Sequence, residues 1–214
     1  MNTDITKITK FLHTMANLKK QLRFKNMPGW ENANIDRWDS VAEHSYRMAL
    51  MAVLYHPYLE QKPDLGKTLK MILVHDIVEL IANDYSPMRS HGGAGGHAFD
   101  IRAYKDKYER EKVAAGIIFK DLPESSMNEC ISLWTEYAGT KLKKTHATLE
   151  GKYAYALDKL EAEMQIVDWK NSIINWTSER TSRSSDYVIE WTEYEKALSE
   201  VEKILKSEMI EMEK

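Results

Sequence analysis

The chain has 214 residues, a formal net charge of -3, one cysteine, 9 glycines and 5 prolines. This charge gives no basic footprint for a nucleic-acid polymer, and no apolar run approaches the ~20 residues that cross a bilayer. The single cysteine, Cys130, excludes an intrachain disulfide and a thiolate-rich zinc cluster. The first residues do not resemble a secretory signal, so we expect a cytoplasmic protein.

The first predicted helix runs from about residue 4 to 22, because apolar residues recur there at helical spacing. Residues 23–39 lose that period, which indicates a loop. Ser40 and Glu43 then form a capping-box pattern, in which each side chain binds a free amide at a helix start. A second helix is therefore expected to begin at Ser40 and to end before Pro57.

A third helix is expected from Pro63 to about residue 82. Its middle, MILVHDIVELIA, is apolar nearly all round, which is typical of a buried helix. Residues 83–98, which hold a proline and four glycines, form a loop. Four more helices are predicted, at about 99–119, 123–138, 146–176 and 185–211. Since no stretch predicts a strand, the expected fold class is all-α, in a single domain over residues 1–214.

The pair His75-Asp76 lies within the apolar third helix. Burying an ionised carboxylate is costly unless a cation or hydrogen bonds compensate, and a metal ion would compensate both residues. Adjacent helical side chains diverge by about 100°, so both can reach one ion between them. His44 could add a second imidazole, and Asp158, an acid in the apolar stretch YAYALDKLEAEM, a carboxylate. Spacing alone leaves open a buried His-Asp pair that simply satisfies itself.

Taken in order, Glu43-His44-Ser45, Val74-His75-Asp76 and Leu157-Asp158 resemble the H…HD…D signature of HD-domain phosphohydrolases. More narrowly, the chain resembles bacterial 5′-deoxynucleotidases and their eukaryotic HD-domain relatives. Other matching elements are Gly29-Trp30, Tyr46-Arg47-Met48, Glu79, Asp84 and Leu133–Tyr137. The resemblance implies an HD-domain helical bundle with a metal-binding core at about 18–168, followed by the C-terminal helix.

The resemblance also implies that His44, His75, Asp76 and Asp158 hold one divalent transition metal ion. Two nitrogen and two oxygen ligands suit Co, Mn, Ni, Fe or Zn, and the sequence does not choose among them. Such an ion lowers the pKa of a bound water and screens the charge of a phosphate. In the resembling enzymes the glutamate at the place of Glu79 is the catalytic acid/base. Without the resemblance, an ordinary polar or ion-paired position is an equal interpretation of Glu79.

Substrate-binding roles follow from the same resemblance. Asp84 would hydrogen-bond a sugar hydroxyl, although a simple turn residue is the alternative. Trp30 would pack on the sugar, although a tryptophan covering the core is the alternative. The bacterial enzymes place an arginine before this tryptophan, where the present chain has Gly29. Because this chain lacks that arginine, another residue would have to bind the phosphate and act as a phosphate clamp. Arg37 is the first candidate.

Arg23 and Arg47 are the next candidates for the phosphate clamp after Arg37. For all three arginines, the alternative is a surface side chain that only contacts solvent. The glycine-rich loop between His91 and His97 lacks the lysine and hydroxyl of a phosphate-binding loop, so it predicts a lid or a surface loop.

The leading predicted reaction converts a 5′-deoxynucleoside monophosphate to a deoxynucleoside and phosphate. A rival releases triphosphate from a deoxynucleoside triphosphate, with cations in residues 102–112 contacting the outer phosphates. Another rival, a di-iron oxidase, needs extra ligands that the sequence does not show near the core site. A third, a non-catalytic metal-stabilised interaction module, gives Glu79 no role. We expect a small-molecule nucleotide substrate and a homodimer, with neither a membrane nor a nucleic-acid polymer as partner.

Overall fold

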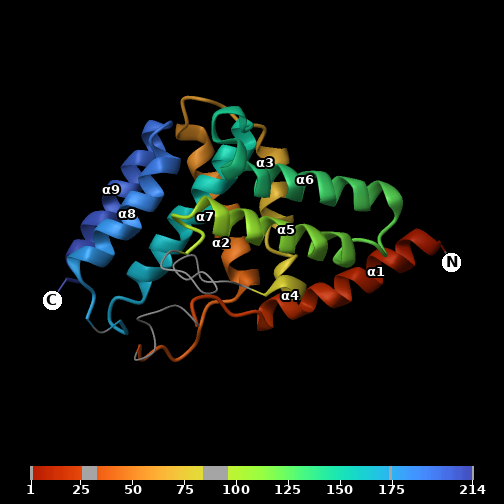
Figure 1. Cartoon of the computed structure of the whole chain (residues 1–214), viewed down its shortest axis with the longest axis horizontal. Coiled ribbons are helices and arrows are strands. Elements are labelled where there is room, and N and C mark those ends of the chain that lie inside the picture. Colours follow the sequence, from red (N-terminus) through yellow and green to blue (C-terminus); the bar gives the residue numbers. More distant parts are fainter. Residues whose placement is uncertain (1, 26–32, 84–95, 174, 214) are drawn as a thin grey trace.

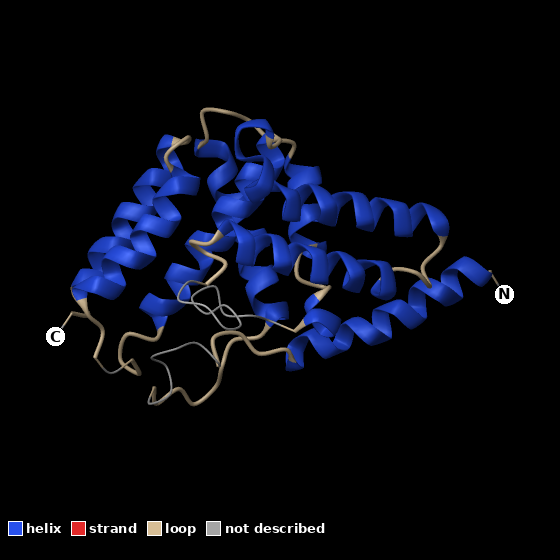
Figure 2. Ribbon diagram, viewed as in Figure 1, coloured by secondary structure: helices blue, strands red, loops and turns tan. Residues whose placement is uncertain are grey.

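The computed structural model describes residues 2–25, 33–83, 96–173 and 175–213. These parts of the chain form an all-α bundle and contain no strand, which confirms the predicted fold class (Figure 2). The helices, and the 3-10 segments labelled η, are α1 (Thr3–Met15), η1 (Ala16–Lys20), α2 (Val41–Tyr55), η2 (His56–Tyr58), α3 (Leu65–Val74), α4 (Glu79–Ala82), α5 (Ile101–Ile118), α6 (Glu124–Lys143), η3 (Lys144–His146), α7 (Leu149–Asp168), α8 (Ser178–Thr192) and α9 (Lys196–Ile210).

Helix α7 is the central element of the bundle. It packs against α2, α3, α6, α8 and α9 (Figure 1). Most of its side chains are buried. The α8–α9 pair lies at one end of the molecule, and α1 lies at the other (Figure 1). Side chains of α7 therefore meet those of α2 and α3 inside the bundle. Among the described helices, none is both long and apolar enough to span a bilayer.

Helix α2 begins where the capping box predicts. The Ser40 side chain accepts a hydrogen bond from the Glu43 amide at 3.3 Å, and the Glu43 carboxylate accepts one from the Ser40 amide at 3.1 Å. The cap satisfies amides that the first helical turn leaves free. It fixes the first turn of α2, which carries His44.

The predicted third helix is interrupted, which corrects the expectation of a continuous helix to residue 82. Helix α3 ends at Val74, and the next helical segment, α4, begins at Glu79. Hydrogen bonds from the Ile77 amide to the Val74 carbonyl and from the Glu79 amide to the Asp76 carbonyl span three residues rather than four. No glycine or proline lies in this segment, so the sequence gives no sign of the tighter winding. It makes His75 the C-cap of α3 and places Asp76 in the turn that follows.

The prediction of one helix at 185–211 is wrong, because α8 ends at Thr192 and α9 begins at Lys196. The buried carboxylate of Glu195 lies between them and accepts hydrogen bonds from the amides of Glu60 and Gln61 at 3.0 and 3.2 Å. A contact with the distant segment before α3 therefore accompanies the break. The predicted helix at 146–176 also ends early, at Asp168.

Candidate metal centre and adjoining pocket

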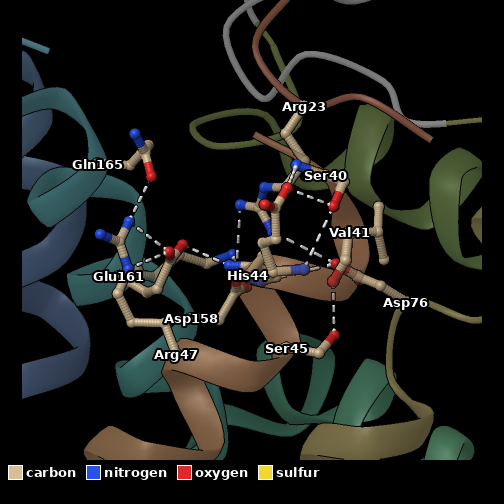
Figure 3. A network of polar contacts seen from close by, with 12 residues as sticks. Arg23, Ser40, Val41, His44, Ser45, Arg47, Asp76, Asp158, Glu161 and Gln165 are labelled. Carbon is tan, nitrogen blue, oxygen red and sulfur yellow. Dashed lines mark hydrogen bonds and ion pairs between the residues drawn. The ribbon is translucent and has the colours of Figure 1, made fainter. Parts of the chain in front are cut away.

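Four predicted metal ligands converge inside the bundle from α2, the end of α3 and α7. Potential ligand atoms of His44, His75 and Asp158 all lie within 4.8 Å of one another, and all three residues are buried. His44 Nε2 lies 3.3 Å from Asp158 Oδ1 and 3.7 Å from Asp76 Oδ2. Asp76 Oδ2 lies 3.0 Å from His75 Nε2. Figure 3 shows Asp76 and Asp158 gathered around His44.

The donor set fits a divalent transition metal ion. The Nδ1 atom of His75 donates to the Ile72 carbonyl at 2.7 Å, which leaves Nε2 as the basic nitrogen. The Nε2 atoms of both His44 and His75 are buried and make no hydrogen bond among the described residues. Neighbouring ligands on one ion, each bound at about 2.1 Å, lie about 3 Å apart. The measured spacings of 3.0–3.7 Å require only small closure around an ion.

The charges of the centre favour a cation. Burial opposes ionisation of Asp76, but His75 and then His44 outweigh it and hold its pKa below the usual range. Burial opposes ionisation of Asp158 as well, but Lys159 and His44 hold its pKa well below the usual range. Burial and Arg23 lower the pKa of His44, yet Glu161 and Asp158 raise it to about 9. The carboxylates thus draw a proton onto an imidazole that a metal ion would displace.

A buried carboxylate behind the centre orients one of the imidazoles. Glu161, fully buried on α7, contacts His44 Nδ1 with one oxygen and accepts from Arg47 Nε at 2.7 Å with the other (Figure 3). Arg47 also pairs with Asp168 and donates to Gln165 at 2.6 Å. Carboxylates in this position fix the tautomer of a metal-binding histidine and raise its basicity. Sequence reasoning missed Glu161, although its spacing of three residues from Asp158 could have suggested it.

The centre opens into a pocket. Arg23 lines this pocket, with its guanidinium nitrogens 3.5 Å from Asp76 Oδ2 and 3.9 Å from Asp158 Oδ1. It is brought there by backbone pairing of its amide with the Asp39 carbonyl at 2.8 Å, beside the start of α2. The charged side chains that line the pocket are Arg23, Lys25, Asp76, Glu79, Lys107, Glu111, Asp158, Lys159 and Glu163.

The remaining predicted residues have different positions. Glu79 is 5% exposed and lines the pocket together with His75, although the chain turns between them. Arg37 does not line the pocket; its exposed side chain binds Glu43 at 2.6 Å. The predictions for Trp30 and Asp84 lie outside the described residues.

The other two candidates for the phosphate clamp and the two loop histidines also differ from one another in position. Arg47 supports Glu161 from behind the metal centre. His97 is buried, and its carbonyl accepts from Lys141 at 2.8 Å, whereas His91 lies outside the described residues. Arg23, ranked behind Arg37 from the sequence, is the arginine that lies against the predicted ligands.

Known proteins are similar to this chain in sequence and in fold. The model of the HD domain family matches residues 15–202. The 5′-deoxynucleotidase HDDC2 of Homo sapiens is 29% identical over 164 residues, which cover 77% of this chain and 69% of that protein. The 5′-deoxynucleotidase YGK1 of Saccharomyces cerevisiae is 26% identical over 193 residues, covering 86% and 79%. The crystal structure of the "Predicted metal-dependent phosphohydrolase" from Magnetospirillum magnetotacticum MS-1 superposes with a TM-score of 0.69 at 24% identity, covering 99% of this chain and 97% of that one.

Proposed function

The chain belongs to the HD domain family, and on that premise we propose that it hydrolyses deoxynucleoside 5′-monophosphates to the deoxynucleoside and phosphate. It is a metal-dependent phosphohydrolase, and relatives at 26–29% identity over most of its length are 5′-deoxynucleotidases. The observation that carries the proposal is the convergence of two buried imidazole nitrogens and two carboxylate oxygens beside a pocket.

His44, His75, Asp76 and Asp158 would hold one divalent ion, drawn from Co, Mn, Ni, Fe or Zn. When bound, such an ion lowers the pKa of a coordinated water and screens the charge of the phosphate. Glu161 keeps the His44 ring oriented by holding its Nδ1 side. The surrounding bundle buries all of these side chains except part of Asp76, which limits competition from bulk water.

Glu79 is the group that we assign to proton transfer with the attacking water or the leaving sugar oxygen. It is nearly buried at the start of α4 and lines the same pocket as His75 and Asp76. Lys107 lies close enough that the charges of Glu111 and Glu79 raise its pKa although burial opposes this. A cation held there also stabilises an ionised Glu79, the form that accepts a proton.

Arg23 replaces Arg37 as the proposed phosphate clamp. Its guanidinium lies against Asp76 and Asp158, and its side chain is 12% exposed, whereas that of Arg37 is 72% exposed and paired with Glu43. A guanidinium in this place can bind a phosphate oxygen in bidentate fashion. The roles of Trp30 on the sugar and of Asp84 on a sugar hydroxyl stay predictions.

Deoxynucleoside triphosphates are the alternative substrates. Of the cations in residues 102–112, Lys107 lines the pocket, but its charge is already engaged by Glu111 and Glu79, so it offers little charge to outer phosphates. A non-catalytic module would have no use for a pocket beside the candidate metal centre. A cytoplasmic location and a homodimer also stay predictions.

Phosphate release measured across a panel of substrates and metals tests the proposal. The chain, stripped with chelator and reloaded with each of the five metals, is offered deoxynucleoside and ribonucleoside monophosphates and deoxynucleoside triphosphates. We expect phosphate from the deoxynucleoside monophosphates with at least one metal, and no release in chelator. Release of triphosphate instead, or no hydrolysis of any monophosphate, would overturn the proposal.

A further inference from the structure

The pocket extends well beyond the metal centre along one face of α7. Its lining includes Asp158, Lys159, Ala162, Glu163 and Ile166, which recur on one helix face. At 1.5 Å per residue, this face covers about 12 Å of the helix axis. The pocket therefore has a second end, one to two helical turns from the residue that would bind metal.

The second end is apolar. Ile166 lines this end from α7. Phe24 also lines the pocket, and its ring packs edge-on against Trp169, the residue directly after α7, with ring centres 5.5 Å apart. Apolar side chains of this kind suit a flat ring system better than they suit a phosphate.

One polar group lies among these apolar side chains without a complete set of partners. Glu163 is 1% exposed, and its Oε1 accepts a hydrogen bond from the Ser184 hydroxyl at 2.9 Å. Its Oε2 is buried and makes no hydrogen bond among the described residues. A buried polar atom of this kind calls for a ligand or another partner.

The protonation of Glu163 decides what kind of partner it needs. Burial raises its pKa to about 8, and the nearby Glu202 adds to the rise, whereas Ser184 and Lys206 oppose it. The carboxyl group is therefore neutral at pH 7. With Oε1 accepting from Ser184, the proton belongs on Oε2, so a side chain that lines the pocket holds an unused donor.

We propose that Glu163 Oε2 donates a hydrogen bond to the base of the bound nucleotide, so that the pocket holds the phosphate at the metal centre and the base against α8. The inference rests on the proposed function, because it assumes a nucleotide substrate. Every nucleobase carries a ring nitrogen or carbonyl oxygen that can accept such a bond, whereas a sugar phosphate without a base has neither. Glu163 thus distinguishes a nucleotide from other small phosphate esters.

The test compares dAMP with 2-deoxyribose 5-phosphate, which has the same reacting end and no base. Glu163→Met keeps the side-chain length and removes the donor. We expect it to raise KM for dAMP about threefold to tenfold, the range of one net hydrogen bond, and to leave KM for 2-deoxyribose 5-phosphate unchanged. Glu163→Gln retains an N–H donor and is expected to restore KM for dAMP.

Glu202→Met is the matched control. Glu202 is also buried, accepts from Ser185 in the same manner, and does not line the pocket. Because burial is the largest cause of the raised pKa of Glu163, Glu163 keeps its proton at pH 6 without Glu202, and at that pH both KM values should stay at the wild-type level. If wild-type chain hydrolyses dAMP and Glu163→Met leaves its KM unchanged, or raises KM equally for both substrates, the inference fails while the proposed function stands. If wild-type chain hydrolyses no deoxynucleoside monophosphate, both fail.

A measurement on wild-type chain covers the case in which Glu163→Met does not fold. The ratio of KM for dAMP to KM for 2-deoxyribose 5-phosphate should rise as pH passes about 8, because ionised Glu163 no longer donates. The titratable groups that influence Glu163 are Glu202 and Lys206 of α9, and Ser184 of α8 binds it directly. A ratio that stays constant from pH 6 to 9 would overturn the inference.

Discussion

Replacing Glu161 by glutamine should weaken metal binding without removing any metal ligand. The carboxylate contacts His44 Nδ1 from a fully buried position, so its negative charge holds the ring with the basic Nε2 toward the other ligands. Glutamine keeps the size and one acceptor oxygen but loses the charge. Charge-assisted hydrogen bonds are worth about 1.5–3 kcal/mol, so we expect affinity to fall roughly 10–100-fold, as for other partners of metal-binding histidines.

The loss of metal affinity in Glu161→Gln should be larger at pH 9 than at pH 7. Glu161 also helps to raise the pKa of His44 to about 9, which favours a proton that competes with the metal ion at pH 7. Glu161→Gln removes part of that competition, which offsets part of the loss at pH 7 and much less of it at pH 9, where about half of His44 has already lost its proton. Calorimetric titration of the stripped chain should therefore show a larger ratio of dissociation constants, variant over wild type, at pH 9. Glu202→Gln serves as the buried-acid control. Unchanged affinity at pH 9 would refute the role given to Glu161.

Three further substitutions have separable outcomes. Glu79→Gln should keep the metal ion and the helix content while lowering kcat about 100-fold or more; full turnover with metal bound would exclude Glu79 from proton transfer. Arg23→Ala should raise KM for the monophosphate about tenfold, whereas Arg37→Ala, at an exposed site, should not; equal effects would contradict the assignment of the clamp. Glu163→Gln should raise the free energy of unfolding in alkaline urea titrations. The folded state holds the Glu163 proton up to about pH 8 and the unfolded state loses it near 4.5, so wild-type stability falls between these values; a gain no larger at pH 8 than at pH 4 would contradict the raised pKa.

Features set by near neighbours in the sequence could be predicted. The start of α2 follows from Ser40 and Glu43 because both halves of the capping box lie within one helical turn. The all-α fold follows from periodicity and from the scarcity of helix-breaking residues. The proposed metal ligands could be predicted only with the help of the family resemblance, because His44 lies on α2 and Asp158 on α7, and contacts between residues far apart in the chain do not follow from local sequence.

Features set by distant contacts could not be predicted. The break between α8 and α9 contains no glycine or proline and coincides with the binding of the Glu195 carboxylate to amides before α3. Glu161 and Glu163 belong to the same apolar stretch as Asp158, but their burial could not be predicted, since it depends on what packs against α7. Arg23 and Arg37 belong to the same predicted loop region, and only the folded chain distinguishes the pocket residue from the surface one.

The proposed function requires one divalent ion, held by His44, His75, Asp76 and Asp158, for phosphate release. The most direct measurement determines metal content by mass spectrometry and phosphate release from dAMP on the same samples of wild-type, His75→Ala and Asp158→Ala chains. We predict one ion per wild-type chain, and neither bound metal nor activity in the two variants at unchanged helix content. Metal-free wild-type chain that still hydrolyses dAMP, or variants that retain both metal and turnover, would contradict the claim.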